Sequence, residues 1–140
     1  MSALFDKTSQ TSIRASAALT DSQVASDSVD VDTWSHVVID VNYTVGTGGT
    51  NPGIELEPQV SDDDTNWTPA ESALAAGAPS AGQVAFAVAT TLYTRATSGR
   101  FSLTFPVYGH KRFRVKVRET GSPSPFGTCA ITAARARVNG

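Results

Sequence analysis

The chain has 140 residues and one cysteine, Cys129, so it is large enough for one domain with a single core but cannot form an intrachain disulfide. Charged residues make up 17% of it, below the usual quarter, and small apolar and hydroxyl-bearing residues abound, as is typical of an all-β domain. Its start lacks a signal-peptide pattern, and no run approaches the roughly 18 apolar residues of a membrane span. We therefore expect synthesis in a cytoplasm, with no membrane partner.

The charges are unevenly distributed along the chain. Residues 1–75 hold twelve acids and two bases, whereas residues 76–140 hold one acid and nine bases. Such asymmetry can mark a nucleic-acid-binding face. Alternatively, the two halves interleave in one sandwich and neutralise each other. We favour this second interpretation, without direct nucleic-acid contact, because the bases alternate with core residues instead of clustering in a tail.

The first 15 residues are polar apart from Leu4, Phe5 and Ile13, a composition that by itself predicts a disordered arm. An ordered arm of this kind must be held by its own domain or by a neighbouring subunit. Its three apolar residues are therefore candidate oligomer contacts. The predicted organisation is an N-terminal extended arm over residues 1–15, followed by a β-sandwich domain over residues 16–140.

Two strands are predicted after the arm. Residues 15–20 form a weak one. Residues 36–45 form a strong one, because apolar side chains alternate with polar ones. The expected buried set is Val37, Ile39, Val41, Tyr43 and Val45. Residues 46–53 are rich in glycine and predict a flexible loop.

Residues 54–60 alternate again, with Ile54, Leu56 and Val60 on one parity. Pro58 cannot donate to a ladder, so an edge strand or a bulge is expected there. Residues 61–66 end the strand with turn formers, and Trp67 is expected to cap the end of the core.

The segment that follows allows two readings. Residues 68–71 match a capping box with proline at the first helical position, which predicts a helical turn over residues 69–76. A plain loop through residues 78–82 is the alternative. A strand is then expected over residues 83–92, with its inward side chains drawn from Val84, Phe86, Val88 and Leu92.

The last part of the chain repeats the strand pattern three times, over residues 100–108, 112–119 and 127–138, with turns at residues 108–111 and 121–125. Seven or eight short strands without a helical period predict an all-β fold, a single antiparallel β-sandwich. Jelly-roll and immunoglobulin-like strand orders remain open, since periodicity does not separate them.

The outer parity of residues 112–119 is basic, and that of residues 54–60 is acidic. If these strands are neighbours, Glu55 and Glu57 face the bases across a ladder. Each such pair would then stabilise the fold by about 0.2–1 kcal/mol. The bases are also candidate contacts in an oligomer or with a capsid. They are Arg112, Arg114, Lys116 and Arg118.

The sequence predicts no catalytic, cofactor or metal site. The acids at positions 27, 30 and 32 and at 62–64 lack EF-hand spacing, and neither His36 nor His110 belongs to a zinc-spaced pair. No nucleophile elbow or phosphate loop appears. The aromatics of a possible sugar-binding platform are expected to pack in the core or at its rim. They are Trp34, Tyr43, Trp67 and Tyr108.

With these segments placed, a resemblance appears in three runs: VVIDVNYTVGTGGTNPGIELEPQVSDDDTNWTP, RFSLTFPVYGHKRFRVKVRE and TCAITAARARV. They resemble small β-sandwich virion proteins of tailed bacteriophages, in which a strand ending in a Ser-Asp-Asp turn precedes a tryptophan and an aromatic-Arg-Val strand follows later. The likeness covers roughly residues 36–138. Asp64 stands where a glycine is common in that turn.

The resemblance implies a structural, non-enzymatic protein without catalytic residues. Its members include capsid decoration, or cement, proteins that sit on the shell as trimers. We therefore expect a cement protein on the capsid surface of a virion, made in the host bacterial cytoplasm, with its own copies and the major capsid protein as partners. The alternatives are a tail, neck or head-tail connector component and, in a different class, a carbohydrate-binding module.

Overall fold

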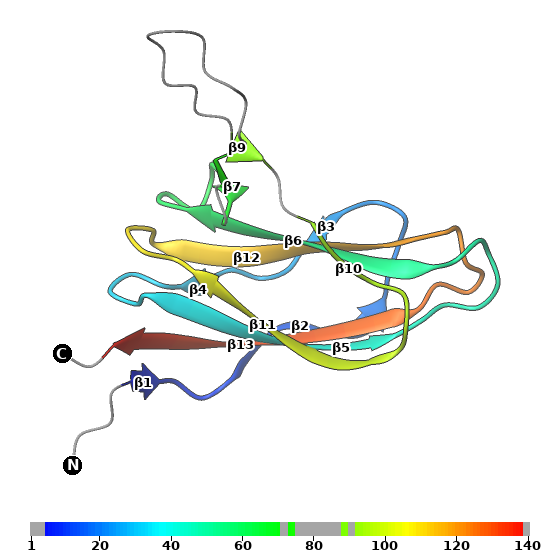
Figure 1. Cartoon of the computed structure of the whole chain (residues 1–140), viewed down its shortest axis with the longest axis horizontal. Coiled ribbons are helices and arrows are strands. Elements are labelled where there is room, and N and C mark those ends of the chain that lie inside the picture. Colours follow the sequence, from blue (N-terminus) through cyan, green and yellow to red (C-terminus); the bar gives the residue numbers. More distant parts are fainter. Residues whose placement is uncertain (1–4, 71–72, 75–87, 90–91, 139–140) are drawn as a thin grey trace, which may run out of the picture.

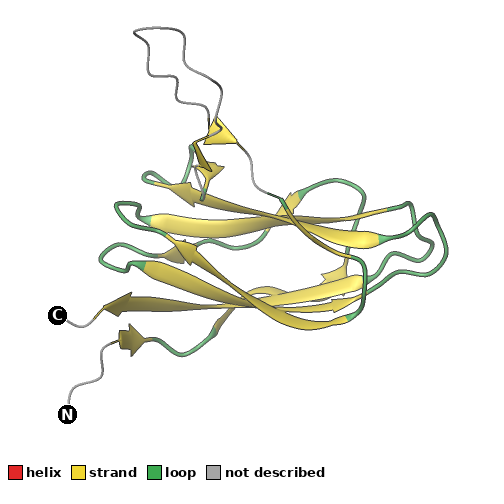
Figure 2. Cartoon of the chain, in the orientation of Figure 1, coloured by secondary structure: helices red, strands yellow, loops and turns green. Residues whose placement is uncertain are grey.

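The computed structural model describes residues 5–70, 73–74, 88–89 and 92–138, and these residues form an all-β fold without helices. Two antiparallel sheets face each other in a sandwich (Figures 1 and 2). The fold class is therefore as predicted. Within these ranges, no helix is long and apolar enough to cross a membrane.

The first sheet, sheet A, is organised around β13 (Thr128–Val138) and β5 (His36–Thr44), which pair antiparallel. On one side β11 (Gly99–Pro106) pairs with β5. On the other side β1 (Phe5–Lys7) and β2 (Thr11–Ala18) pair with successive parts of β13.

The second sheet, sheet B, is organised around β6 (Gly53–Ser61) and β12 (Arg112–Thr120). Beyond β6 lie β10 (Tyr93–Arg95) and β7 (Thr68–Pro69). Beyond β12 lie β3 (Val24–Ala25) and β4 (Val29–Asp30). A separate pair consists of β8 (Ala73–Leu74) and β9 (Val88–Ala89).

The core fills the space between the sheets and follows the predicted parity. In β5, Val37, Ile39, Val41 and Tyr43 are at most 1% exposed. The inward residues of β6 and β12 are equally buried, and Phe105 of β11 stacks on Phe113 of β12 with ring centroids 5.8 Å apart. Period-2 alternation predicts these faces because successive side chains of a strand point to opposite sides.

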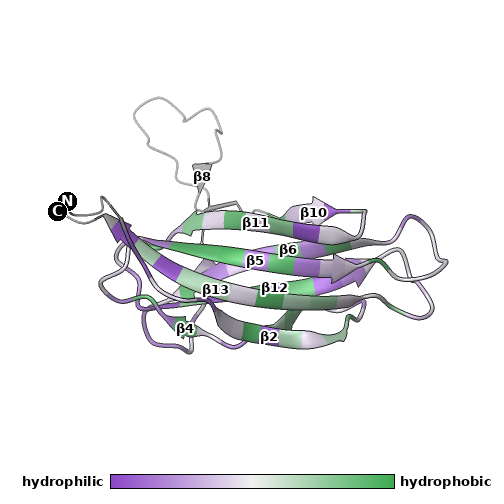
Figure 3. Ribbon diagram, turned by 90° about the horizontal axis from the view of Figure 1, so that it is seen from below, coloured by the Kyte–Doolittle hydropathy of each residue, from purple (hydrophilic) through white to green (hydrophobic). Residues whose placement is uncertain are grey.

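The sandwich has two long edges where the chain passes from one sheet to the other. At one edge the chain leaves β2 for β3, and Asp27 N donates to Ile13 O over 2.9 Å. At the other, β10 leads directly into β11, and the Arg95 guanidinium lies 5.1 Å from the Phe101 ring centroid. Figure 3 shows β10 and β11 along one edge and β2 and β4 along the opposite edge.

Pro58 is neither on a fully free edge nor in a bulge, because β6 pairs with β12 in unbroken register through Val115 opposite it. On the other side of β6, β10 covers residues 54–56 and β7 covers residues 59–60. Pro58 O accepts from Ala70 N on that side. Its nitrogen faces the same way as its carbonyl, so the missing N–H falls in the gap between β10 and β7 and costs no ladder bond to β12.

Three other local expectations need correction. Residues 68–69 and 73–74 are strands, so the predicted helical turn is wrong where the chain is described. Pairing of β7 with β6 and of β8 with β9 outweighs the capping signal. Leu92 is 46% exposed rather than buried. Trp67 does not cap the core but packs under Arg114 on the outer face of sheet B. Val84, Phe86 and the 78–82 loop lie outside the described residues.

Candidate functional site

The predicted charge ladder is present on the outer face of sheet B. Arg118 lies opposite Glu55, and its Nε and Nη2 reach the two carboxylate oxygens at 3.1 and 3.2 Å. Lys116 lies opposite Glu57 and Arg114 opposite Gln59. The two strands are therefore neighbours, and the conditional expectation that Glu55 and Glu57 then face the bases of β12 is met. The opposed charge halves of the sequence meet here.

Most of the basic side chains of β12 are held by contacts within the chain. Arg112 donates to Ser28 Oγ over 2.7 Å and lies 3.7 Å from Asp64. Arg114 donates to Gln59 Oε1 over 2.8 Å and stacks 4.1 Å from the Trp67 ring centroid. In the described part of the chain, Lys116 alone of these four bases has no ion pair or hydrogen bond.

The N-terminal residues lie along their own sheet. Phe5 pairs through its backbone with Val138, and residues 11–18 form β2. Ile13 is only 2% exposed in the core, since its parity on β2 faces inward. Its side chain is therefore not available as the oligomer contact that the sequence suggested. Leu4 lies outside the described residues, as does the side chain of Phe5.

The acidic turn at residues 61–66 is internally bonded. Asp63 accepts from the backbone N–H groups of Thr65 and Asn66, at 2.9 and 2.7 Å, and these bonds hold its pKa well below the usual value. Asp64 has a φ of 59°, a left-handed conformation that glycine adopts most readily. Among the described residues, no group of three or more potential ligands is placed to hold a metal ion.

Neither histidine belongs to a catalytic constellation. His36 Nδ1 lies 2.9 Å from Ser35 Oγ, and its ring meets Tyr108 edge to face. His110 Nδ1 lies 3.3 Å from Asp62 Oδ1. In the described structure neither ring bonds both an acid and a serine, which is the arrangement that nucleophile activation requires.

A hollow of about 530 Å³ lies at the end of the sandwich where β5 and β12 begin. Residues 32–35, residues 108–111 and Arg137 line it. Trp34 packs partly against the core, as expected for a plug, and the guanidinium of Arg137 covers its ring at 4.5 Å. Tyr108 is 61% exposed. The structure thus brings together two of the four aromatics, but one ring face is already occupied, and this arrangement does not form a flat sugar platform.

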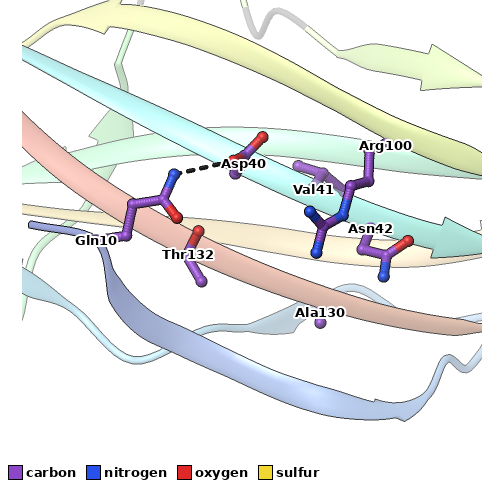
Figure 4. A pocket seen from close by; sticks show the side chains of 7 residues that line it. All are labelled: Gln10, Asp40, Val41, Asn42, Arg100, Ala130 and Thr132. Carbon is purple, nitrogen blue, oxygen red and sulfur yellow. Dashed lines mark hydrogen bonds between the residues drawn. The ribbon is translucent and has the colours of Figure 1, made fainter.

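A second, smaller hollow of about 110 Å³ lies on the outer face of sheet A (Figure 4). Its acid, Asp40, accepts from Ser102 Oγ at 2.8 Å and from Gln10 Nε2 at 2.9 Å. These bonds, the one from Ser102 first, lower the pKa of Asp40. Figure 4 shows Arg100 and Thr132 at the same hollow. A single carboxylate kept ionised by neutral donors is a structural element, not a general base.

One buried polar cluster escaped sequence reasoning. Glu119 is 0% exposed, and its carboxylate accepts from the Tyr43 hydroxyl, Gly46 N at 2.9 Å and Gly127 N at 2.6 Å. It joins sheet B to the two loops at the other end of the sandwich. A Cβ on Gly127 would collide with the Thr44 carbonyl. The strand alternation could have predicted that Glu119 is buried, because it continues the inward series of positions 113, 115 and 117.

No protein-family model matches the chain, and no curated protein matches it in sequence. Among solved structures, the crystal structure of the SPBc2 prophage-derived protein YomS matches with a TM-score of 0.55 and 12% identity, over 97% of each chain. A chain from Bacillus endospore appendages, described as disulfide-linked pili, matches at 0.42 and 12%, over 99% of this chain and 95% of its own. One from Desmodium yellow mottle tymovirus matches at 0.43 and 9%, over 94% and 84%. At 12% identity the likeness to the YomS structure is one of fold.

Proposed function

We propose that this protein is a non-enzymatic structural component of a tailed-bacteriophage particle, a cement protein that binds the capsid exterior and stabilises it. The observation that carries the proposal is the shared fold with YomS, a prophage-derived protein, over 97% of each chain. The sequence resemblance to phage virion proteins points the same way and supplies the cement role.

The described side chains support a structural role over an enzymatic one. The charged groups on the two outer faces mainly hold strands and turns together, as Arg118 does with Glu55 and Asp63 does with Asn66. Nothing in the geometry of His36 or His110 prepares a nucleophile or a general base. Because the β12 bases face acids and polar groups of β6, we also propose no direct role in nucleic-acid binding.

Cement proteins must hold a repeated site on a completed shell. We propose that the chain acts as a homo-oligomer, with a trimer favoured by the resemblance, and that the major capsid protein is its partner. Several identical patches on one oligomer raise the effective concentration at the shell, so a weak single contact suffices. Candidate contacts are the N-terminal Leu4 and Phe5 and the outward bases of β12, which are Arg112, Arg114, Lys116 and Arg118.

The experiment is removal and add-back on intact particles. Particles stripped of this protein should lose resistance to heat or genome pressure and regain it when purified protein is added. Lys116→Ala should weaken rebinding without altering folding, since that side chain has no bond to lose in the described structure. Lys111→Ala, at the end of the sandwich, is the control for loss of one positive charge.

Equal resistance with and without the protein would reject the capsid role. Binding found at the tail or neck would favour the alternative position on the same particle. Retention on immobilised polysaccharide, abolished by Tyr108→Ala, would instead favour a carbohydrate-binding module.

A further inference from the structure

The two long edges of the sandwich carry opposite charge. Residues 15–94 contain no lysine or arginine, and residues 72–118 contain no aspartate or glutamate. The fold places part of the first range, β2 to β4, along one edge and part of the second, β10 and β11, along the other (Figure 3). We call these the acidic edge, residues 15–32, and the basic edge, residues 92–106.

The acidic edge presents four exposed carboxylates. Four arginines reach this edge, but they donate to backbone carbonyls and to one serine hydroxyl, not to the carboxylates of the four acids. Arg14 donates to Ala18 O at 3.1 Å, Arg135 to Asp30 O at 3.0 Å, Arg118 to Asp21 O at 3.5 Å and Arg112 to Ser28 Oγ at 2.7 Å. In the described structure, none of the four acids has an ion pair within 4 Å, the range in which the ladder pairs lie. They are Asp21, Asp27, Asp30 and Asp32.

The basic edge presents Arg95 and Arg100. Arg95 donates to Thr97 O over 3.0 Å and stacks on Phe101, which holds its guanidinium at the edge. Arg100 is exposed on the edge strand β11, and its side chain lies at the hollow on the outer face of sheet A (Figure 4). The carboxylate of neighbouring Asp40 is already bonded by Ser102 and Gln10. Neither arginine forms an ion pair among the described residues.

Each edge also carries exposed apolar surface. Of the described large hydrophobic residues, Val24 on the acidic edge is 45% exposed and Leu92 on the basic edge is 46% exposed; the third such residue, Tyr108, lies at the end. Within the described chain, β11 pairs only with β5, so its other side offers free backbone groups. An apolar centre with a charged rim is the usual composition of a protein contact.

We infer that the basic edge of one copy docks on the acidic edge of the next, so that copies of this chain associate head to tail. This inference rests on the proposed homo-oligomer and adds its contact surfaces. The occupant is a second copy because that copy supplies the complementary charge and an exposed aliphatic side chain at the matching edge. A two-fold contact would oppose like charges, whereas a head-to-tail contact pairs unlike ones and closes into a ring or extends into a filament.

The test is charge reversal at each edge, followed by repair. The basic-edge variant is Arg95→Glu with Arg100→Glu. The acidic-edge variant is Asp21→Lys with Asp27→Lys and Asp32→Lys, which leaves Asp30 as the one acid of residues 15–32 and turns that edge basic. None of the three replaced carboxylates accepts a backbone hydrogen bond in the described structure, so folding should survive, as circular dichroism will show. Each variant should associate on the order of tenfold to a hundredfold more weakly than the parent in analytical ultracentrifugation.

The combined variant carries both reversals and restores unlike charges between the edges, so it should return to the parent mass. Equal mixtures of the two single-edge variants should also associate, since one then has two acidic edges and the other two basic edges. Lys7→Glu with Lys111→Glu, which changes the net charge as much as the basic-edge variant does, should retain the parent mass. Salt at 1 M should weaken the parent association, because screening shortens to about 3 Å.

The outcomes separate this inference from the proposed function. Single-edge variants that keep the parent mass would overturn the edge contact and point to another occupant of the edges, including a segment of the same chain. A folded combined variant that stays dissociated would overturn it as well. A parent chain that is monomeric at all concentrations would overturn both the edge contact and the homo-oligomer, whereas particle binding is decided independently by add-back.

Discussion

The hydroxyl of Tyr43, on sheet A, donates a hydrogen bond to the carboxylate of Glu119, on sheet B, and neither side chain is more than 1% exposed. The same carboxylate accepts the N–H groups of Gly46 and Gly127. The buried carboxylate is tolerated because it accepts hydrogen bonds from all three of these donors, which replace its bonds to water. This one group therefore ties the two sheets to the loops at one end of the sandwich.

Replacing Glu119 by alanine should destabilise the protein by at least about 3 kcal/mol. It leaves the buried Tyr43 hydroxyl, the buried Gly127 N–H and the partly buried Gly46 N–H without an acceptor, and a buried group in that state costs about 1–3 kcal/mol. Tyr43→Phe should cost less, about 1–3 kcal/mol, because the carboxylate keeps two donors. Urea unfolding measures both, with the exposed Tyr108→Phe as control. A Glu119→Ala protein as stable as the parent would show that the loops do not depend on this cluster.

Stability should fall as the pH rises above about 9. Burial raises the pKa of the Cys129 thiol from 9.0 to about 11, and burial together with the Glu119 hydrogen bond raises that of Tyr43 above 10.0. Above the pKa that each group has in the unfolded chain, the unfolded chain loses a proton that the folded chain keeps. The free energy of unfolding therefore falls as the pH rises, by about 1.4 kcal/mol per pH unit for each group.

Chemical unfolding at a series of pH values checks this dependence. Cys129→Ala should flatten the curve between pH 9 and 10, where only the thiol of the pair is titrating in the unfolded chain. Tyr43→Phe should flatten it above pH 10. A parent whose stability is level from pH 8 to pH 11 would contradict both assignments.

Breaking the Glu55–Arg118 pair should cost only about 0.2–1 kcal/mol, because the arginine side chain is 38% exposed even though that of the glutamate is only 12% exposed. A double-mutant cycle with Glu55→Gln and Arg118→Gln isolates the coupling. The coupling should shrink in 1 M salt, where charges are screened. A coupling of several kcal/mol would mean that the pair is far less hydrated than its exposure implies.

Thr33→Asn should stabilise the protein by up to about 1 kcal/mol. Thr33 has a φ of 71°, a left-handed conformation that is unfavourable for a β-branched residue and that asparagine adopts more readily. It lies in the turn closed by Trp34 N donating to Val31 O at 2.9 Å, beside the large hollow. Thermal unfolding measures the gain, and Thr47→Asn, in a loop at the other end, controls for composition. A loss of stability would show that the threonine side chain has a local role that outweighs the strain.

The strands and their buried faces were predictable because period-2 alternation is local. Val37, Ile39 and Phe113 are inward for the same reason that their neighbours in sequence are outward: a strand turns each side chain to the opposite face. The charge of the outward positions allowed only a conditional prediction, that acids face bases if β6 and β12 are neighbours. The turn at residues 61–66 followed from residues that bond their own backbone.

What only the tertiary structure decided is which distant segments share a site. Glu119 occupies an inward strand position, although it is a charged residue of the type usually found at the surface. Its burial is possible because Tyr43 and Gly127 donate hydrogen bonds to it, and they reach it only when the two sheets pack together. Pro58 fits an internal strand because β10 and β7 leave a gap opposite it. The charge asymmetry was visible in the sequence, but its division into a neutralised ladder and two opposite edges depends on strand order. That order is set by packing and pairing between residues far apart along the chain, which local periodicity does not encode.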